Sequence, residues 1–110
     1  MQEPTFYILT ALADQARHGY GVMQAVHRIS DGRLTLRPGT LYAALDRLTT
    51  DGLIAVDREE VLDSRMRRYY RLTDAGAAVL AAEAQRLRGN AAIAHERLRR
   101  RTAARPALGT

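Results

Sequence analysis

The clearest amphipathic pattern in the chain lies between Arg37 and Ile54. Leu41, Leu45 and Leu48 recur four and then three residues apart, which is one face of an α-helix. Pro38 suits the start of this helix, and Asp51-Gly52 suits its end. The other side is polar, with small hydrogen-bonding residues at its front. Such a helix can enter a DNA major groove, but on these residues alone an ordinary helix of a small bundle is the better interpretation.

Two further helices are expected before this stretch. An apolar arc from Phe6 to Leu12, with Pro4 in the first turn, predicts a helix over residues 4–16. The HGYG segment at residues 18–21 interrupts it, and His18 is interpreted as a structural residue at the start of a second helix that ends near Ser30-Asp31-Gly32. Residues 33–36 alternate weakly and predict a short extended piece. The first arc is wider than one small core needs, which suggests that part of this helix, including Phe6 and Leu9, faces a partner chain.

After Gly52 the pattern becomes that of a β-hairpin. A first strand is predicted to run to Val61, a turn over residues 62–65 and a second strand over residues 66–72, with Tyr70 and Leu72 on one face. Four arginines fall within seven residues of this hairpin, and only Asp63 lies close to them in the sequence. Charged residues often protect a solvent-exposed strand edge, but a cluster with so few acids is explained better as a basic binding surface. These arginines are Arg65, Arg67, Arg68 and Arg71.

The last element is predicted to be a long helix that begins after Thr73, a plausible N-cap. Its apolar residues follow alternating spacings of three and four, which is typical of a helix-pairing seam. Gly89-Asn90 interrupts the helix-favouring sequence, and whether it bends or ends the helix stays open. The chain is thus divided into residues 1–72, a C-terminal dimerisation helix over residues 73–102 and a disordered tail over residues 103–110. The seam residues assigned to the dimer are Leu80, Ala84, Leu87, Ala91, Ala94 and Leu98.

Composition adds a basic balance to this picture. The chain has 110 residues, enough for one domain, and a formal charge of +5 with a pI of about 10.4. All 17 basic residues are arginine. Arginine binds phosphate and guanine through two parallel hydrogen bonds, so this usage suits nucleic acid, although GC-rich codons would produce it equally well. A chain this short buries a small share of its surface, so a second copy would help it.

Other classes of protein are disfavoured by what the sequence lacks. Without cysteine there is no disulfide, thiolate zinc site or redox thiol, and the three histidines show no metal-ligand spacing. Ser30 and Ser64 stand in no nucleophile motif, so we expect neither an enzyme nor a cofactor. There is no secretory signal and no apolar run long enough for a bilayer, so a soluble cytoplasmic protein without membrane contact is expected.

The order of the predicted elements, three helices, a hairpin and a helix, is that of a winged helix-turn-helix. Several short motifs, in register from about residue 6 to about residue 80, resemble the PadR-like transcriptional regulators, specifically the short subgroup with one C-terminal helix. Each motif is weak alone, but together at these separations they are specific. They are LTAL at 9–12, HGYG at 18–21, PGTLY at 38–42, ALDRL at 44–48, GLI at 52–54 and RRYYRLT at 67–73, followed by Ala75-Gly76.

The resemblance implies a mainly α fold with a small β-hairpin, namely a winged helix-turn-helix plus a C-terminal dimerisation helix. It implies a homodimer that binds an inverted-repeat operator in double-stranded DNA and usually represses transcription. The family's DNA-contacting positions fall on Thr40, Tyr42, Arg67 and Arg68; from the residues themselves we add Arg37, Ala43, Arg47 and Arg65. Helix 1 and the C-terminal helix build the family's dimer, and some members bind phenolic or multidrug ligands near it. A small hydrophobic or aromatic effector is therefore a further potential partner.

Two departures and two alternatives stay open. Arg37 stands where the family often has Ser or Asn, and an arginine cannot cap a helix N-terminus; Arg65-Met66 replaces a Gly- and Pro-rich wing tip. The main alternative is a winged-helix module for protein interaction or dimerisation that binds no DNA, since one fold serves many functions. A ligand sensor is the third interpretation, but there is no Trp and Phe6 is the single Phe, so an aromatic pocket is not assured.

Overall fold

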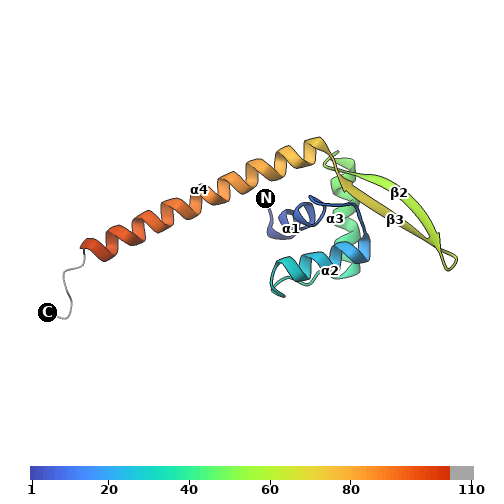
Figure 1. Cartoon of the computed structure of the whole chain (residues 1–110), viewed down its shortest axis with the longest axis horizontal. Helices are drawn as coiled ribbons and strands as arrows, with labels where there is room; N and C mark the ends of the chain where they lie inside the picture. The colour runs from blue at the N-terminus through green and yellow to red at the C-terminus, as the bar shows by residue number, and fades with distance from the viewer. Residues whose placement is uncertain (105–110) are drawn as a thin grey trace.

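The computed structural model describes residues 1–104 of the 110-residue chain. It confirms the predicted fold class: there are four helices and a small three-stranded antiparallel sheet of order β1-β3-β2, with α1, α2 and α3 gathered at the base of the hairpin, in the arrangement of a winged helix-turn-helix (Figure 1). The elements are α1 (Glu3–Ala11), β1 (Arg17–His18), α2 (Gly19–Ile29), α3 (Pro38–Thr50), β2 (Ile54–Leu62), β3 (Arg65–Leu72) and α4 (Asp74–Ala104).

The core forms where the apolar faces of α1, α2 and α3 meet the base of the sheet. Leu41, Leu45 and Leu48 are all buried there, as their spacing predicts. Tyr70 is buried too and Leu72 is half-buried, which agrees with their predicted common strand face. Burial of these side chains fixes α3 against the domain by one face and leaves its opposite face free.

The first helix is shorter than its pattern predicts. It ends at Ala11, whose carbonyl accepts a hydrogen bond of 2.7 Å from the Arg17 Nε. The turn brings Arg17 and His18 beside β3 as strand β1, paired with Tyr70 and Tyr69. A strand of two residues carries too little alternation to be read from the sequence.

The segment before α3 is predicted to be a short extended piece. Residues 34–37 belong to neither a helix nor a strand, and the buried Ser30 accepts a hydrogen bond at its Oγ from the Leu34 N–H. The predicted ends of α2 and α3 are otherwise confirmed within one or two residues.

Helix α4 leaves the domain on the side opposite the hairpin and gives the molecule its length of 73 Å (Figure 1). Its N-cap is Thr73 as predicted: the Thr73 Oγ1 accepts from the Gly76 N–H and donates to the Gly52 carbonyl. The sequence leaves open whether Gly89-Asn90 ends the helix, and in the structure the helix passes through both residues to Ala104. It therefore continues two residues beyond the predicted end at residue 102, and the rest of the predicted tail, residues 105–110, lies outside the described residues.

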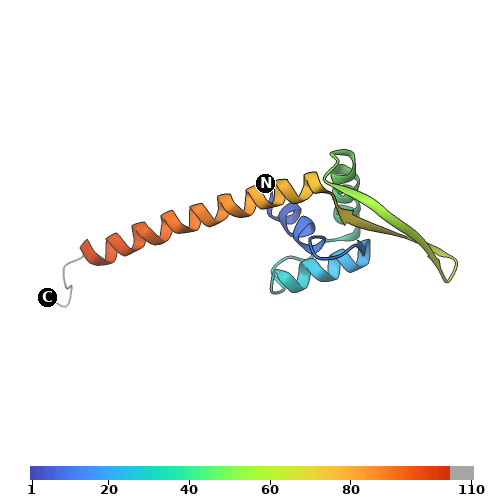
Figure 2. The same cartoon turned by 45° about the horizontal axis from the view of Figure 1, so that its top comes forward.

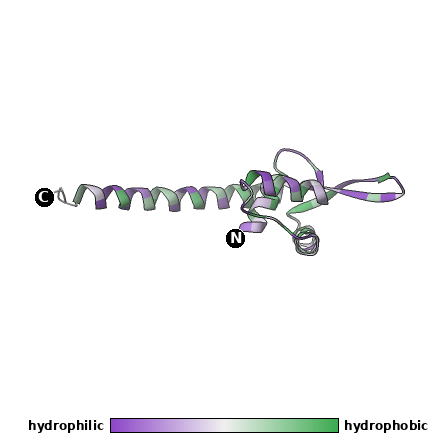
Figure 3. Cartoon of the chain, turned by 90° about the horizontal axis from the view of Figure 1, so that it is seen from below, coloured by the Kyte–Doolittle hydropathy of each residue, from purple (hydrophilic) through white to green (hydrophobic). Residues whose placement is uncertain are grey.

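The N-terminal part of α4 lies against α1: the Met1 amine is 3.4 Å from the Glu83 carboxylate, and Leu87 lines a cavity together with Phe6. Leu80 packs against the core of its own domain, but the residues after it are mostly exposed. Figure 3 shows apolar and polar residues alternating along this exposed arm. No helix in the described part of the chain is long and apolar enough to cross a membrane.

Candidate nucleic-acid interface

Helix α3 presents a broad exposed face made of small residues. Gly39, Ala43, Asp46 and Thr50 follow one another along its centre and are all exposed, opposite the buried leucines. Arg37 occupies the N-cap position without a capping hydrogen bond from its side chain, as expected for arginine. Arg37 and Thr40 are exposed at this end of the helix. The face is therefore accessible along its whole length and unobstructed at its front.

Tyr42 lies at the edge of this face, against the start of α2. A Cβ placed on Gly19 would come within 2.5 Å of the Tyr42 Oη and 2.7 Å of its Cζ, so the ring rests on the bare backbone of that glycine. The side chain of Tyr42 remains 47% exposed. Gly19 thus sets how α3 and α2 approach each other beside the exposed face.

His18 has the structural role that the sequence indicates. Its Nδ1 accepts a hydrogen bond of 3.1 Å from the Gly21 N–H and so caps α2. Its ring meets Tyr69 edge to face at 5.3 Å. Burial, and then the nearby positive charge of Arg67, lower the pKa of His18 below its usual value. The imidazole is therefore held neutral, the form that can accept from Gly21.

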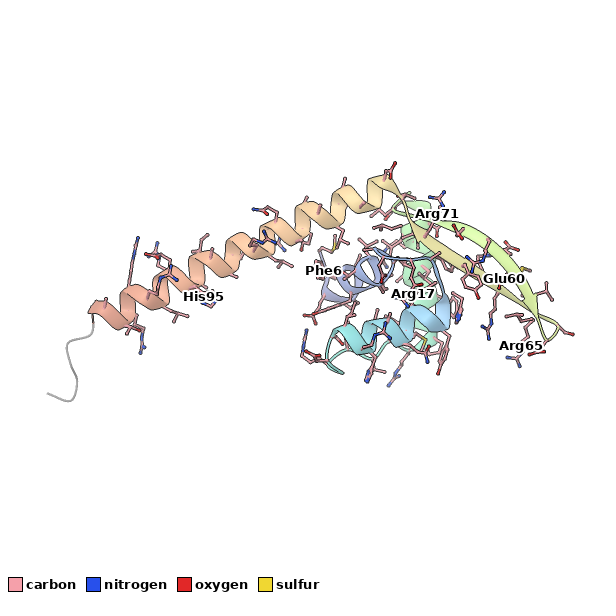
Figure 4. All side chains as sticks on the ribbon, viewed as in Figure 1. Phe6, Arg17, Glu60, Arg65, Arg71 and His95 are labelled. Carbon is pink, nitrogen blue, oxygen red and sulfur yellow. The ribbon has the colours of Figure 1, made fainter. Side chains whose placement is uncertain are left out.

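The hairpin of β2 and β3 projects from the domain as a wing, defined as residues 54–72 (Figure 2). Its turn has positive φ at both central residues, Asp63 (50°) and Ser64 (63°), as in the two-residue turns that match strand twist. A bulge at Asp57 shifts the register between the strands. Arg65 follows the turn and lies near the tip of the wing (Figure 4).

Two of the four clustered wing arginines are paired with acids that are not their neighbours in the sequence. The strand register sets Glu59 opposite Arg68, and the carboxylate of Glu59 lies 3.5 Å from the Arg68 Nε. Asp57, at the bulge of β2, lies 4.0 Å from the Arg71 Nε. Arg58, which stacks 3.9 Å from the centre of the Tyr69 ring, pairs with Asp57 and Glu60. Within residues 1–104, Arg65 and Arg67 are the wing arginines that have no ion pair.

The wing, α3 and the start of α2 enclose an open hollow of about 520 Å³, called the groove below. It brings together Tyr42, Arg65, Arg67 and Arg68, four residues predicted to contact DNA. Arg47 lies elsewhere: its guanidinium donates to the Thr5 hydroxyl of α1 at 3.3 Å, on the other flank of α3. Residues not predicted for the site also line the groove, among them His18, Tyr20 and Asp46. Asp46 could have been found from its place on the polar face of α3.

The residues predicted for a dimer interface differ in how deeply the single chain buries them. Leu9 is fully buried in the core of its own domain, so its assignment to an interface is wrong: its side chain leaves no surface for a partner. Leu80 is half-buried against that same core. Phe6 and Leu87 line a cavity of about 160 Å³ between α1 and α4. Ala84, Leu87, Ala91, Ala94 and Leu98 are exposed in the single chain.

Comparison with known proteins connects this architecture to a family. The sequence model described as "Transcriptional regulator PadR-like family" matches residues 8–82. The chain is 43% identical over 74 residues to Transcriptional regulator Rv3488 of Mycobacterium tuberculosis, across 67% of this chain and 65% of that protein. The match therefore spans less than two thirds of that relative's length.

Two solved structures share the fold. A PadR family transcription regulator from Clostridium difficile superposes with a TM-score of 0.71 at 24% identity, covering 86% of this chain and 96% of that one. Bacillus subtilis PadR in complex with operator DNA superposes with a TM-score of 0.66 at 22% identity, covering 74% and 47%. Since the family model covers more than half of the sequence and these structures share its winged fold, the chain belongs to the PadR-like family of transcriptional regulators.

Proposed function

We propose that this protein is a homodimeric repressor that binds an inverted-repeat operator in double-stranded DNA within the cytoplasm. The carrying observation is the groove, in which the free face of α3 and the two unpaired wing arginines of residues 1–104, Arg65 and Arg67, face the same space. In this proposal α3 enters the major groove and reads base edges, and the wing lies along the adjoining backbone. The Bacillus subtilis protein of the same fold was solved with operator DNA, which supports the proposal.

The proposal needs two copies of the chain. One recognition helix covers only a few base pairs, whereas two helices about 34 Å apart read successive turns of the duplex from one side. Such spacing needs a rigid connector, and the exposed seam of α4 is suited to this role. Phe6, beside Leu87, would join the same interface.

A small hydrophobic or aromatic effector would bind between α1 and α4. The cavity there, lined by Phe6, Tyr7 and Leu87, holds about 160 Å³ in the single chain. Ligand pockets are usually about 300–1,000 Å³, so the second chain would have to enlarge it. A screen for compounds that release the protein from its selected DNA tests this part of the proposal.

Selection of bound sequences from a random DNA pool, followed by a salt titration, tests DNA binding directly. Arg37, Arg65 and Arg67 from each of two chains would neutralise about six phosphates, so log affinity should fall against log salt with a slope of roughly −5. The five arginines of the wing face four acids in the same hairpin, so its net charge is small and a steeper slope is not expected. Failure to enrich any sequence at low salt would instead favour the protein-interaction module.

Gly19→Ala should weaken DNA binding through Tyr42. The new methyl group would displace the Tyr42 ring from the Gly19 backbone. Since Tyr42 is an exposed side chain that can rotate into solvent, thermal stability should change little. Affinity for the selected DNA should fall by about 1 kcal/mol, the value of a hydrogen bond from the displaced hydroxyl. The same change made in a Tyr42→Ala background should have no further effect, and equal losses in both backgrounds would contradict the role of this contact.

A further inference from the structure

The centre of the exposed α3 face carries one charged residue, Asp46. Its neighbours along that face, Gly39, Ala43 and Thr50, have smaller side chains or none. Asp46 is exposed, lines the groove and forms no ion pair with any of residues 1–104. Among the residues along the centre of this face, which is proposed to enter DNA, Asp46 therefore has the longest side chain. Its carboxylate is available to contact a base.

The wing arginines leave this carboxylate unpaired. Arg68, which lines the same groove, is engaged by Glu59 on the opposite strand. Arg65 and Arg67 also line the groove, but neither lies within ion-pair distance of Asp46. A negative charge brought toward phosphates opposes binding, so Asp46 weakens non-specific binding unless DNA offers it a hydrogen-bond donor.

The major groove offers a carboxylate only two kinds of donor, the N4 amine of cytosine and the N6 amine of adenine. Beside the adenine amine stands the N7 acceptor, which repels the second carboxylate oxygen. Beside the cytosine amine stands a C–H group, which does not. An aspartate therefore selects cytosine, whereas the amide of asparagine, with a donor and an acceptor, selects adenine.

We propose that Asp46 is a specificity-determining residue that accepts a hydrogen bond from the N4 amine of a cytosine in each operator half-site. This inference rests on the proposed function and adds to it the base that the centre of α3 reads. Asp46 lowers the affinity for DNA that has another base at the contacted position, and the hydrogen bond to cytosine offsets this loss.

The test is selection from the same random DNA pool with the full chain, Asp46→Ala, Asp46→Asn and the control Asp51→Asn. Asp51 caps the other end of α3, is exposed and lies outside the groove, so its change removes the same charge from the same helix. The parent and Asp51→Asn should both prefer cytosine at one position per half-site, by roughly tenfold. Asp46→Asn should prefer adenine there, and Asp46→Ala should accept any base and bind unrelated DNA more tightly than the parent.

Several results would overturn the assignment. If Asp46→Ala enriches the same sequences as the parent, or loses affinity equally for all of them, Asp46 does not read a base. If the parent enriches no sequence, DNA binding itself fails and this inference fails with it. Circular dichroism of each variant confirms that the comparison is made between folded proteins.

Discussion

Gly76→Ala should destabilise the protein severely, whereas Gly89→Ala in the same helix should stabilise it. A Cβ on Gly76 would overlap the carbonyl oxygen of Leu53 and come within 2.8 Å of the Leu72 Cδ1. Gly89 is exposed, with nothing within 4 Å of the corresponding position. One added methyl group therefore meets backbone at the first site and open space at the second.

The obstacle at Gly76 cannot easily move. The Leu53 carbonyl accepts a hydrogen bond from the Thr73 N–H at 3.1 Å, and Thr73 also donates through its hydroxyl to the Gly52 carbonyl at 2.7 Å. Relief of the overlap would shift the start of α4 away from the end of α3 and break these two hydrogen bonds. We expect Gly76→Ala to lower the free energy of unfolding by about 3 kcal/mol, and Gly89→Ala to raise it by about 1 kcal/mol, the helix-propensity difference.

Thermal and denaturant unfolding, followed by circular dichroism at one fixed protein concentration, measure both effects. A fixed concentration matters because association would raise the apparent stability. Similar small effects from the two substitutions would mean that α4 does not dock on Leu53 as the structure has it.

The local signals of the sequence predict much of this fold. The leucine spacing of α3, the capping role of His18 and the N-cap at Thr73 each depend on residues within one or two turns of each other, and all are confirmed. Gly89-Asn90 is the local signal that leaves the course of a helix open. Strong helix formers on both sides, and solvent around the glycine, let α4 continue through it.

What the sequence cannot predict depends on residues that are distant along the chain. The acids that neutralise Arg68 and Arg71 lie across the hairpin, and only the strand register brings them close. Arg47 turns from the groove because Thr5, 42 residues earlier, accepts its hydrogen bond. Leu9 looks like surplus apolar surface until α1 is packed, when it becomes core. The composition of the groove was therefore predictable only in part.

Leu87→Asp should convert the proposed dimer into a folded monomer with little affinity for operator DNA. Leu87 is 41% exposed in the single chain and lies beyond Leu80, where α4 leaves its own domain. Since it is not part of the buried core, an aspartate there should be tolerated by an isolated chain. In a dimer paired along α4, the same position would bury one carboxylate from each chain.

Arg86, which precedes Leu87, is already engaged by another carboxylate. Arg86 donates from its Nε and from its second guanidinium nitrogen to the two oxygens of Glu83, at 2.8 and 2.6 Å. Those hydrogen bonds lower the pKa of Glu83 to about 2. An unpaired buried carboxylate costs several kcal/mol, more than an alanine-rich seam readily absorbs. Loss of about 3 kcal/mol of association would weaken operator binding by at least roughly 100-fold.

Two control variants separate charge from shape. Leu87→Met keeps nearly the same volume and should remain a dimer. Gln85→Asp adds the same charge to the exposed opposite side of α4, two residues away, and should leave association unchanged. Sedimentation of the parent and the three variants at equal concentration, together with operator titrations, measures both consequences. A monomeric parent, or an intact dimer in Leu87→Asp, would show that α4 does not connect the two chains. A helix that does not pair at Leu87 cannot hold two recognition helices one turn of DNA apart.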